Sequence, residues 1–286
     1  MQLAILTRNA RLYTTKRLVQ AIRSRGHDAQ LINPFRVTLF THPWQVRQGR
    51  RVLAIPKGGV IRLGSQGVWP TLALARHLQA MGTHWLNELG AMDVARDKWH
   101  TLQRLTQAGI PVPPTFTNVA ASMSGWLRQS PEWVIKSTTG LQGTGVMLAP
   151  SYASAIGVAD ALRGMRVDSI VQPYYTESKG QDIRCLVIDG QVVASMIRTQ
   201  LGGDFRSNVH QGGVAQPVIP TPLECEMAIE SARAIDLMVA GVDIIRTHSG
   251  PMVLEVNASP GLEGIESVHT PLLAELMIDS LLRRLS

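Results

Sequence analysis

The chain has 286 residues, of which 45% are hydrophobic and 17% charged, so it can form a sizeable core divided over two or three lobes. Two cysteines, Cys185 and Cys225, are too few for a disulfide-rich secreted protein, and the apolar runs are too short for a signal-peptide core or a membrane span. The net charge of +7 favours an acidic partner, but no basic run interleaved with aromatic residues supports nucleic acid. We therefore expect a cytoplasmic protein without a membrane partner.

The first predicted unit spans residues 1–93 and begins with the strand–helix–strand pattern of a small α/β domain. Gly26 follows the predicted helix as a C-terminal cap. Two strands joined by a helix within about thirty residues are predicted to be parallel, with a right-handed crossover. The predicted elements are a strand at 2–6, a helix at 14–25, a strand at 29–32, a loop at 41–49 and a helix at 70–81.

The second predicted unit, residues 94–175, contains a glycine-rich segment between two strands. Gly140, Gly143 and Gly145 allow backbone N–H groups to approach an anion closely, and Lys136 adds a cation at the start of the segment. The segment lacks the Gly-Lys-Ser/Thr ending of a P-loop, so we interpret it as a flap over a triphosphate, with an ordinary hairpin as the alternative. The predicted elements are a helix at 97–108, strands at 133–136 and 146–148, a helix at 152–163 and a strand at 170–172.

The third predicted unit, residues 176–286, contains two hairpins. Asp189-Gly190 between two apolar runs is a strong hairpin signal, and Thr221 with Glu224 matches a capping box at the start of a helix. The predicted elements are strands at 183–188 and 192–197, a helix at 221–237, strands at 239–245 and 252–256, and a helix at 272–285.

The second hairpin carries a cluster of oxygen ligands. With its centre near Ser249, Asp243 should face Glu255, and the two-residue period of a strand places Asn257 on the same face as Glu255. Opposed carboxylates repel each other unless a cation lies between them, and such ligands suit Mg²⁺ holding nucleotide phosphates. An exposed acidic face with solvated charges is the alternative.

A basic cluster comprises Arg198 and a polar segment with Arg206, Ser207 and Asn208. Arginine is a permanent cation whose planar fork suits phosphate and carboxylate groups. The alternative is a solvated basic loop. Lys98 lies at the start of a predicted helix, and the sequence alone leaves two roles for it: a contact to nucleotide, or an ordinary solvated lysine.

These clusters occur in a fixed order, and together they resemble the RimK-like alpha-L-glutamate ligases of the ATP-grasp superfamily. The match is strongest in DIRCLV (182–187), GDFRSN (203–208) and residues 239–266, and the last stretch, with AGVDIIR (240–246) and LEVNASPGLEGIE (254–266), is highly specific for the family. The resemblance implies an α/β (α+β) ATP-grasp fold. Its parts are an N-terminal pre-ATP-grasp domain with a small parallel sheet, a central lid domain, and a C-terminal catalytic domain with an antiparallel sheet.

The resemblance also implies ATP and Mg²⁺ as cofactors, with Mn²⁺ as an alternative metal. It assigns the metal to Asp243, Glu255 and Asn257, and the catalytic cations to Lys136, Arg198 and Arg206. The residues implied in nucleotide binding are Lys98, Lys136, Gly140, Gln142, Gly143, Gly145, Gln172, Pro173, Tyr174, Asp182, Arg206, Ser207 and Asn208.

The chain departs from the family pattern at four positions. Pro173 stands where an acidic residue is usual, and Thr139 replaces a glutamate. Pro173 keeps its carbonyl, so recognition of adenine through that carbonyl can survive. Thr199 and Leu201 stand where the glutamate ligases tend to have basic residues, which leaves the identity of the added amino acid open.

The implied activity is an ADP-forming ligation that makes an amide bond through an acyl-phosphate. The expected partners are an amino acid, in the first place glutamate, and the C-terminal carboxylate of a peptide or protein. Two alternatives are the same chemistry in peptide natural-product or amino-group-carrier biosynthesis, and a nucleotide-binding regulatory module without turnover. The resemblance further implies a homo-oligomer, a dimer or a tetramer.

Overall fold

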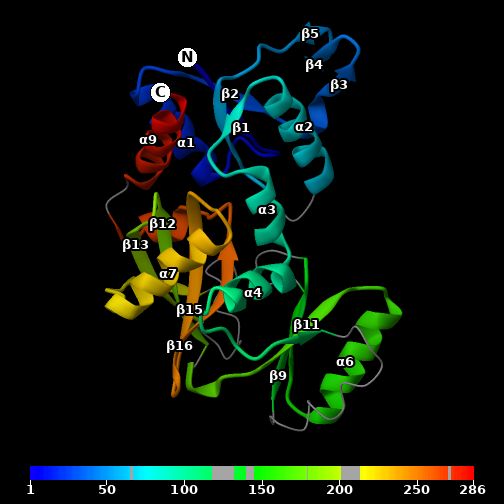
Figure 1. Cartoon of the computed structure of the whole chain (residues 1–286), viewed down its shortest axis with the longest axis vertical. Helices are drawn as coiled ribbons and strands as arrows, with labels where there is room; N and C mark the ends of the chain where they lie inside the picture. The colour runs from blue at the N-terminus through cyan, green and yellow to red at the C-terminus, as the bar shows by residue number, and fades with distance from the viewer. Residues whose placement is uncertain (65–66, 118–131, 140–144, 179, 201–212, 270–271) are drawn as a thin grey trace.

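The computed structural model describes residues 1–64, 67–117, 132–139, 145–178, 180–200, 213–269 and 272–286. Figure 1 shows three lobes: a mixed N-terminal lobe at the top, a lobe built on an antiparallel sheet below it, and a smaller lobe at the lower right. The N- and C-termini both lie at the top of the molecule. Among the described helices, none is both long and apolar enough to cross a membrane.

The N-terminal lobe is built on a parallel sheet in the order β2-β1-β6-β7. The predicted parallel pairing of the first two strands is confirmed, because Gln2 pairs with Asp28 and Leu6 with Ile32. Strand β6 was not predicted, since its two glycines give it a weak strand signal. The elements are β1 (Gln2–Leu6), α1 (Tyr13–Ser24), β2 (Asp28–Ile32), η1 (Pro34–Arg36), β6 (Gly58–Ile61), α2 (Val68–Ala80) and β7 (His84–Trp85).

The loop predicted at 41–49 is wrong. This stretch belongs to an antiparallel sheet of β3 (Thr38–Thr41), β4 (Trp44–Gln48) and β5 (Arg51–Val52). Pro43 occupies the tight turn between β3 and β4, where Thr41 pairs with Trp44. Within β4 only Val46 is buried, so the sequence lacks the apolar alternation by which a strand is recognised.

The central lobe holds an antiparallel sheet in the order β10-β9-β11-β8. Helix α6 packs on β9 and β10, and the predicted strands on either side of the glycine-rich segment pair with each other. The predicted helix at 97–108 is α4, with the Asp97 carboxylate accepting hydrogen bonds from the backbone N–H groups of Trp99 and His100. The elements are α3 (Leu89–Arg96), α4 (Lys98–Gln107), β8 (Phe116–Thr117), β9 (Trp133–Ser137), β10 (Val146–Ala149), α6 (Tyr152–Gly164) and β11 (Ser169–Pro173). The division at residue 93 falls inside α3 and stays a prediction.

The C-terminal lobe holds a five-stranded sheet in the order β14-β13-β12-β15-β16. Both predicted hairpins are confirmed, and Thr221 and Glu224 form the predicted capping box. Helix α7 packs on β12, β13, β15 and β16. The elements are η2 (Thr176–Ser178), β12 (Gln181–Ile188), β13 (Gln191–Thr199), β14 (Val214–Pro217), α7 (Pro222–Ala234), β15 (Val239–Thr247), β16 (Gly250–Asn257), α8 (Glu263–Glu266) and α9 (Leu273–Leu285).

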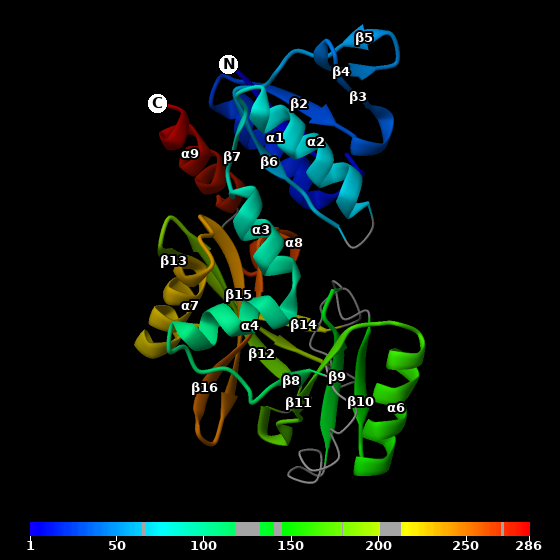
Figure 2. The ribbon, with the colours of Figure 1, turned by 45° about the vertical axis from the view of Figure 1, so that its right-hand side comes forward.

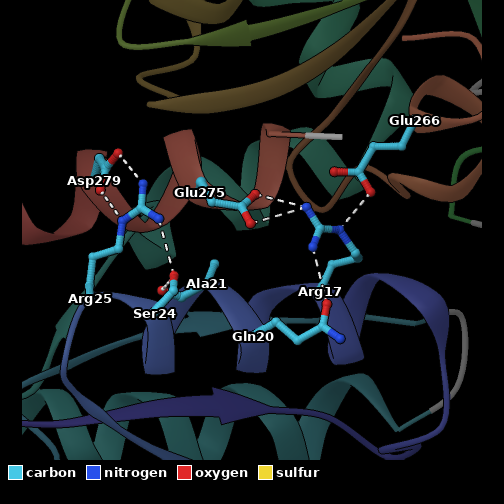
Figure 3. A network of polar contacts seen from close by, with 8 residues as sticks. All are labelled: Arg17, Gln20, Ala21, Ser24, Arg25, Glu266, Glu275 and Asp279. Atoms are coloured by element: carbon cyan, nitrogen blue, oxygen red, sulfur yellow. Dashed lines mark hydrogen bonds and ion pairs between the residues drawn. The ribbon is translucent and has the colours of Figure 1, made fainter. Parts of the chain in front are cut away.

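The N-terminal and C-terminal lobes share a core, in which residues of α1 and β1 pack with residues of β12, β13 and α9. Helix α9 returns to the N-terminal lobe and lies against α1, as Figure 2 shows. Arg17 of α1 and Arg25, which directly follows α1, fix this contact (Figure 3): Arg25 forms a two-pronged pair with Asp279 at 2.8 Å, and Arg17 reaches Glu275 at 2.9 Å. The last helix therefore holds the C-terminal sheet against the N-terminal lobe.

Candidate active site

One face of the five-stranded sheet changes from apolar to charged along its strands. On β12, Leu186 and Ile188 point into the core shared with α9, whereas Ile183 and Cys185 point into the core under α7. The two-residue period of a strand places Asp182 and Arg184 on the same face as Leu186 and Ile188. Several of the predicted site residues lie at this charged end of the face.

The predicted pairing of Asp243 with Glu255 across β15 and β16 is confirmed. Val242 and Ile244 are buried in the core under α7, so Asp243 and its neighbour Gly241 face the opposite, charged side. Gly241 pairs with Asn257, which brings that side chain to the same patch. Two carboxylates and an amide therefore lie together at one end of the hairpin.

A β-bulge produces this pairing. The turn is centred between His248 and Ser249, because Thr247 pairs with Gly250. An unbroken register from that turn would place Leu254 opposite Asp243. The ladder shifts by one residue at Leu254, and the shift brings Glu255 opposite Asp243.

Two arginines hold the Asp243 carboxylate. Arg184 on β12 donates to both of its oxygens at 2.7 and 2.6 Å, and Arg198 on β13 reaches Oδ2 at 3.0 Å. Arg198 in turn donates to both oxygens of Asp182 at 2.6 Å. The four side chains form a continuous network, in which the side chains of Arg198 and Asp243 are only 4% and 5% exposed.

The network fixes the charges of its members. Burial on its own raises the pKa of Asp243, but Arg184 and Arg198 outweigh it and hold that pKa below its usual range. Burial on its own lowers the pKa of Arg198, but Asp243 and Asp182 outweigh it and raise that pKa. Arg198 and Asp243 therefore remain ionised within the fold.

Sequence reasoning did not assign a role to Arg184. The sequence carried a signal for it, because Asp182 and Arg184 alternate with the apolar Ile183 and Cys185. The register adds what the sequence does not show, by pairing Arg184 with Asp243 across β12 and β15. Arg184 thus belongs to the candidate site as the closest cationic partner of Asp243.

The two predicted phosphate lysines reach the same patch from the central lobe. Lys98 is the first residue of α4, and its Nζ lies 3.8 Å from Oε1 of Glu255. Burial lowers the pKa of Lys136, on β9, to about 8, and the nearby Glu255 carboxylate opposes that shift. The backbone N–H of Lys98 donates to the carbonyl of Thr138 at 3.0 Å, which ties the start of α4 to the end of β9.

The oxygen atoms of Asp243, Glu255 and Asn257 suit the binding of a divalent cation. An ionised carboxylate offers about four acceptor positions, and the three contacts to Asp243 from Arg184 and Arg198 leave room for one more at Oδ1. The buried Nδ2 of Asn257 has no hydrogen-bond partner in the part of the chain that the structure describes, so the amide can turn its oxygen inward without losing a bond. Within the same described residues, no group of three or more His, Cys, Asp or Glu side chains forms a metal site. An oxygen-only set of two carboxylates and an amide suits Mg²⁺ that also binds phosphate.

Of the glycine-rich segment, only Gly145 lies within the described residues; Gly140, Gln142 and Gly143 lie outside them. Gly145 has a φ of +78°, and a Cβ added there would lie 2.6 Å from the Ser137 hydroxyl. Its carbonyl accepts a hydrogen bond from the backbone N–H of Ser137 at 3.0 Å. Position 145 therefore requires glycine for both conformation and space.

The predicted adenine-side residues lie at the end of β11. Gln172 is buried and donates to the Thr115 hydroxyl at 2.9 Å. Pro173 pairs with Trp133, and the backbone N–H of Tyr174 donates to the Glu132 carbonyl at 3.1 Å. These residues border β9, the strand that carries Lys136. Arg206, Ser207, Asn208 and Leu201 lie outside the described residues.

The segment that follows β16 is attached to the N-terminal lobe along its length. The Arg62 guanidinium donates to the Pro260 carbonyl at 2.7 Å, and Thr14 accepts from the backbone N–H of Leu262 at 2.9 Å. Figure 3 shows Arg17 between Glu266 and α9. Two further hydrogen bonds run from the Asn87 amide to the Ala258 carbonyl and from the Ser259 hydroxyl to the Ile61 carbonyl.

Comparisons with known proteins agree with this architecture. The model of the RimK PreATP-grasp domain matches residues 1–92, and that of the RimK-like ATP-grasp domain matches residues 95–281. A protein of Alkalilimnicola ehrlichii named "Probable alpha-L-glutamate ligase" is 42% identical, covering 93% of this chain and 90% of its own. A protein of Halorhodospira halophila with the same name is 39% identical, and the match covers 98% of this chain and 94% of that protein.

Solved structures share the fold at low identity. The ATP-grasp ligase PsnB, in a complex with a precursor variant, Mg and ADP, superposes with a TM-score of 0.75 at 18% identity, covering 99% of this chain and 98% of its own. D-cycloserine synthetase DcsG gives a TM-score of 0.76 at 20% identity, with 100% of both chains covered. D-alanine–D-alanine ligase of Bacillus anthracis, in a complex with ATP, gives a TM-score of 0.71 at 14% identity, covering 100% of this chain and 97% of its own. The matched domains and the relatives show that the chain belongs to the RimK-like ATP-grasp family and is an ATP-dependent, ADP-forming ligase.

Proposed function

We propose that this ligase adds an amino acid, in the first place glutamate, to the C-terminal carboxylate of a peptide or protein. The observation that carries the proposal is the meeting of Asp243, Glu255 and Asn257 with Lys98 and Lys136 at the charged end of the sheet. The names of the relatives support glutamate, and the precursor-bound PsnB structure supports a peptide acceptor.

The charge distribution supports an acidic acceptor. Residues 1–92 contain 13 Lys and Arg but only 2 Asp and Glu, so the positive charge of the chain is concentrated in the N-terminal lobe. A growing chain of glutamates is an anion of the opposite sign, and a positive field raises its rate of encounter with the site. This field is screened by salt within about 10 Å at 0.1 M ionic strength.

In the proposed first step, Lys98 and Lys136 bind the phosphates of ATP. An oxygen of the acceptor carboxylate attacks the γ-phosphorus, the bond to the β-γ bridging oxygen breaks, and ADP leaves with the electron pair. Lys136, Arg198 and Arg206 offset the charge that spreads over the phosphoryl oxygens in this step. The backbone around Gly145 covers the phosphates and limits access of water, which would hydrolyse the acyl-phosphate.

In the second step, the neutral amine of the amino acid attacks the carbonyl carbon of the acyl-phosphate. The carbon–nitrogen bond forms, the carbon–oxygen bond to phosphate breaks, and nitrogen loses a proton as phosphate leaves. The side chains that carry these steps act by position and charge, so no covalent enzyme nucleophile is needed.

We assign Mg²⁺ to Asp243, Glu255 and Asn257, where it would neutralise charge on the β- and γ-phosphates when bound. The two arginines at Asp243 keep that carboxylate ionised without the metal. Gln172, Pro173, Tyr174 and Asp182 are proposed to face the nucleoside, and a dimer or tetramer is the proposed assembly.

The experiment that tests the proposed function measures ADP release from Mg²⁺-ATP with a panel of single amino acids and an acidic acceptor peptide. Products are read by mass spectrometry. We expect one amino acid, glutamate first, to stimulate ADP release and to raise the acceptor mass by its own mass less water. ADP release that proceeds without any amide product, whatever the amino acid, would instead favour a regulatory nucleotide-binding module.

A further inference from the structure

Arg62 differs from Arg17, Arg184 and Arg198 in its polar contacts. Within the described part of the chain, the Arg62 side chain donates one hydrogen bond, from Nη1 to the Pro260 carbonyl at 2.7 Å. Arg17, Arg184 and Arg198 each form ion pairs with carboxylates. For Arg62, no carboxylate lies within ion-pair distance among the described residues, which leaves its positive charge without a counter-charge there.

The surroundings of Arg62 disfavour an unpaired cation. The Arg62 side chain is half-buried, burial lowers its pKa to about 10, and no carboxylate among the described residues raises that pKa again. A charge withdrawn from water is costly unless it is paired, and arginine suits two-pronged binding of a carboxylate. The pKa still lies far above neutrality, so the guanidinium keeps its charge. An anionic ligand would supply the missing partner.

The position of Arg62 in the fold suits a ligand. It directly follows β6, at the carboxyl end of a parallel strand, where open α/β sheets bind their ligands. Its backbone N–H donates to the Leu6 carbonyl at 2.9 Å, so the end of β1 holds this residue in place.

A short chain of contacts joins Arg62 to the candidate active site. Arg62 holds Pro260, and the ring of Pro260 lies over Gly241, where an added Cβ would be 3.1 Å away. Such a Cβ would also lie 3.8 Å from Cβ of Asn257 and 3.8 Å from Nε of Arg184. Arg62 therefore lies, on the side of the N-terminal lobe, against a residue that borders the metal-ligand patch, whereas Lys98 and Lys136 approach the patch from the central lobe.

We infer that Arg62 binds a carboxylate of the incoming amino acid and thereby selects amino acids as the amine substrate. This inference rests on the proposed function. The amine must reach the acyl-phosphate carbonyl beside Asp243 and Glu255, and an amino acid carries its α-carboxylate only one carbon from that amine. The C-terminal carboxylate of the acceptor is consumed at the phosphate side, so this group does not remain as an anion for Arg62. The carboxylate held is either the α-carboxylate or that of the side chain.

The test compares glutamate with two amides of the same size. Isoglutamine lacks the α-carboxylate and glutamine lacks the side-chain carboxylate, so the two arms identify which group Arg62 holds. Amide formation is measured with Arg62→Met, Arg62→Lys and, as a matched control on an exposed arginine of the same lobe, Arg51→Met. If the panel of single amino acids identifies a substrate other than glutamate, that amino acid takes the place of glutamate, and its α-amide takes the place of isoglutamine.

We expect wild type and Arg51→Met to prefer glutamate over one amide by about 10²-fold in kcat/KM, as for a site built around a charged hydrogen bond. Arg62→Met should lose this preference, mainly through a higher KM for glutamate, with the KM for ATP unchanged. Arg62→Lys keeps the positive charge and should retain part of the preference for glutamate. It replaces Arg62→Met in the comparison if the methionine variant does not fold.

A purely structural role, in which Arg62 only anchors Pro260, predicts a different result. Glutamate and both amides would then decline by the same factor in Arg62→Met, and a preserved preference would overturn the inference while leaving the proposed function standing. A wild-type protein that forms no amide with any amino acid would overturn the proposed function and the role of Arg62 with it.

Discussion

Asp243 and Glu255 face each other across β15 and β16 because β16 contains one extra residue, Leu254. The bulge also explains the core under α7, in which Val253 and Val256 are both buried. Residues three apart on a regular strand point to opposite faces, so both can enter one core only if the register shifts between them. The same shift that completes the core places Glu255 and Asn257 beside Asp243.

The first prediction concerns the proposed metal ligands. Asp243→Asn and Glu255→Gln should each lower kcat of amide formation by about 10²-fold or more, since each removes a charge that the phosphate site needs. Asp93→Asn, at an exposed pair with Arg76, is the matched control and should leave activity unchanged. Initial rates over a range of Mg²⁺ concentrations test this, and wild-type rates in both variants would contradict the assignment.

The two substitutions should differ in their effect on stability. Asp243→Asn weakens a buried network with Arg184 and Arg198, and breaking such a pair costs about 3–5 kcal/mol. Glu255 has only the 3.8 Å contact with Lys98 among its described ion pairs, so Glu255→Gln should leave the free energy of unfolding nearly unchanged. Urea unfolding measures the free energy of unfolding of both variants. If Asp243→Asn is as stable as Glu255→Gln, the network around Asp243 is not stabilising.

The second prediction compares two glycines of the central lobe. Gly145→Ala places a Cβ against the Ser137 hydroxyl at a φ of +78° and should cost about 1–2 kcal/mol or more, with a raised KM for ATP. Gly157→Ala lies in α6 with open space around its Cβ and should stabilise the lobe by about 0.5–1 kcal/mol. Thermal unfolding and ATP saturation curves test the pair. Equal effects of the two substitutions would be inconsistent with a conformational requirement at position 145.

The third prediction addresses Asp182, whose carboxylate accepts two hydrogen bonds from Arg198. Asp182→Asn and Arg198→Gln should have strongly non-additive effects on the free energy of unfolding, with a coupling of about 1–3 kcal/mol, because each removes the partner of the other. A double-mutant cycle measures this coupling. Additive effects would indicate that Asp182 acts apart from Arg198, for example only at the nucleoside.

The fourth prediction is a pH dependence of stability at Glu224. Burial on its own raises the pKa of Glu224, but hydrogen bonds from Arg246 and the backbone N–H of Thr221 outweigh it and lower that pKa. A lowered folded pKa stabilises the protein above the unfolded value, about 4.3, and this stability is lost as the pH falls through the folded pKa. Glu224→Gln should therefore lose stability at pH 7 and show a flatter decline below pH 5. The free energy of unfolding of wild type and Glu224→Gln, measured at several pH values, tests this prediction. Parallel curves for the two proteins would contradict it.

Periodicity in the sequence predicted the elements with a clear apolar pattern. The hairpin at Asp189-Gly190 has both residues at positive φ, and the capping box at Thr221 forms as expected. The β3–β5 sheet was missed because its strands are mostly exposed, and β6 because glycine carries little strand signal. These errors have different causes, since β3–β5 bury few side chains, whereas β6 is buried along its length but begins with two glycines.

The candidate site was predictable in its carboxylates but not in their partners. The sequence placed Asp243 opposite Glu255 by assuming a turn centred at Ser249, whereas the structure reaches the same pairing through a two-residue turn and a bulge. The role of Arg184 depends on the register between β12 and β15, and that of Arg62 on the contact between two lobes. Both are long-range relationships, which local sequence patterns do not specify.

The most direct test of the central claim follows the oxygen atoms of the acceptor. The acceptor peptide is prepared with both oxygens of its C-terminal carboxylate isotopically labelled and is incubated with the protein, Mg²⁺-ATP and the amino acid. An acyl-phosphate route predicts that ADP forms and that each released phosphate carries one labelled oxygen, because the oxygen that attacks phosphorus leaves with it. Unlabelled phosphate, or AMP in place of ADP, would contradict the account.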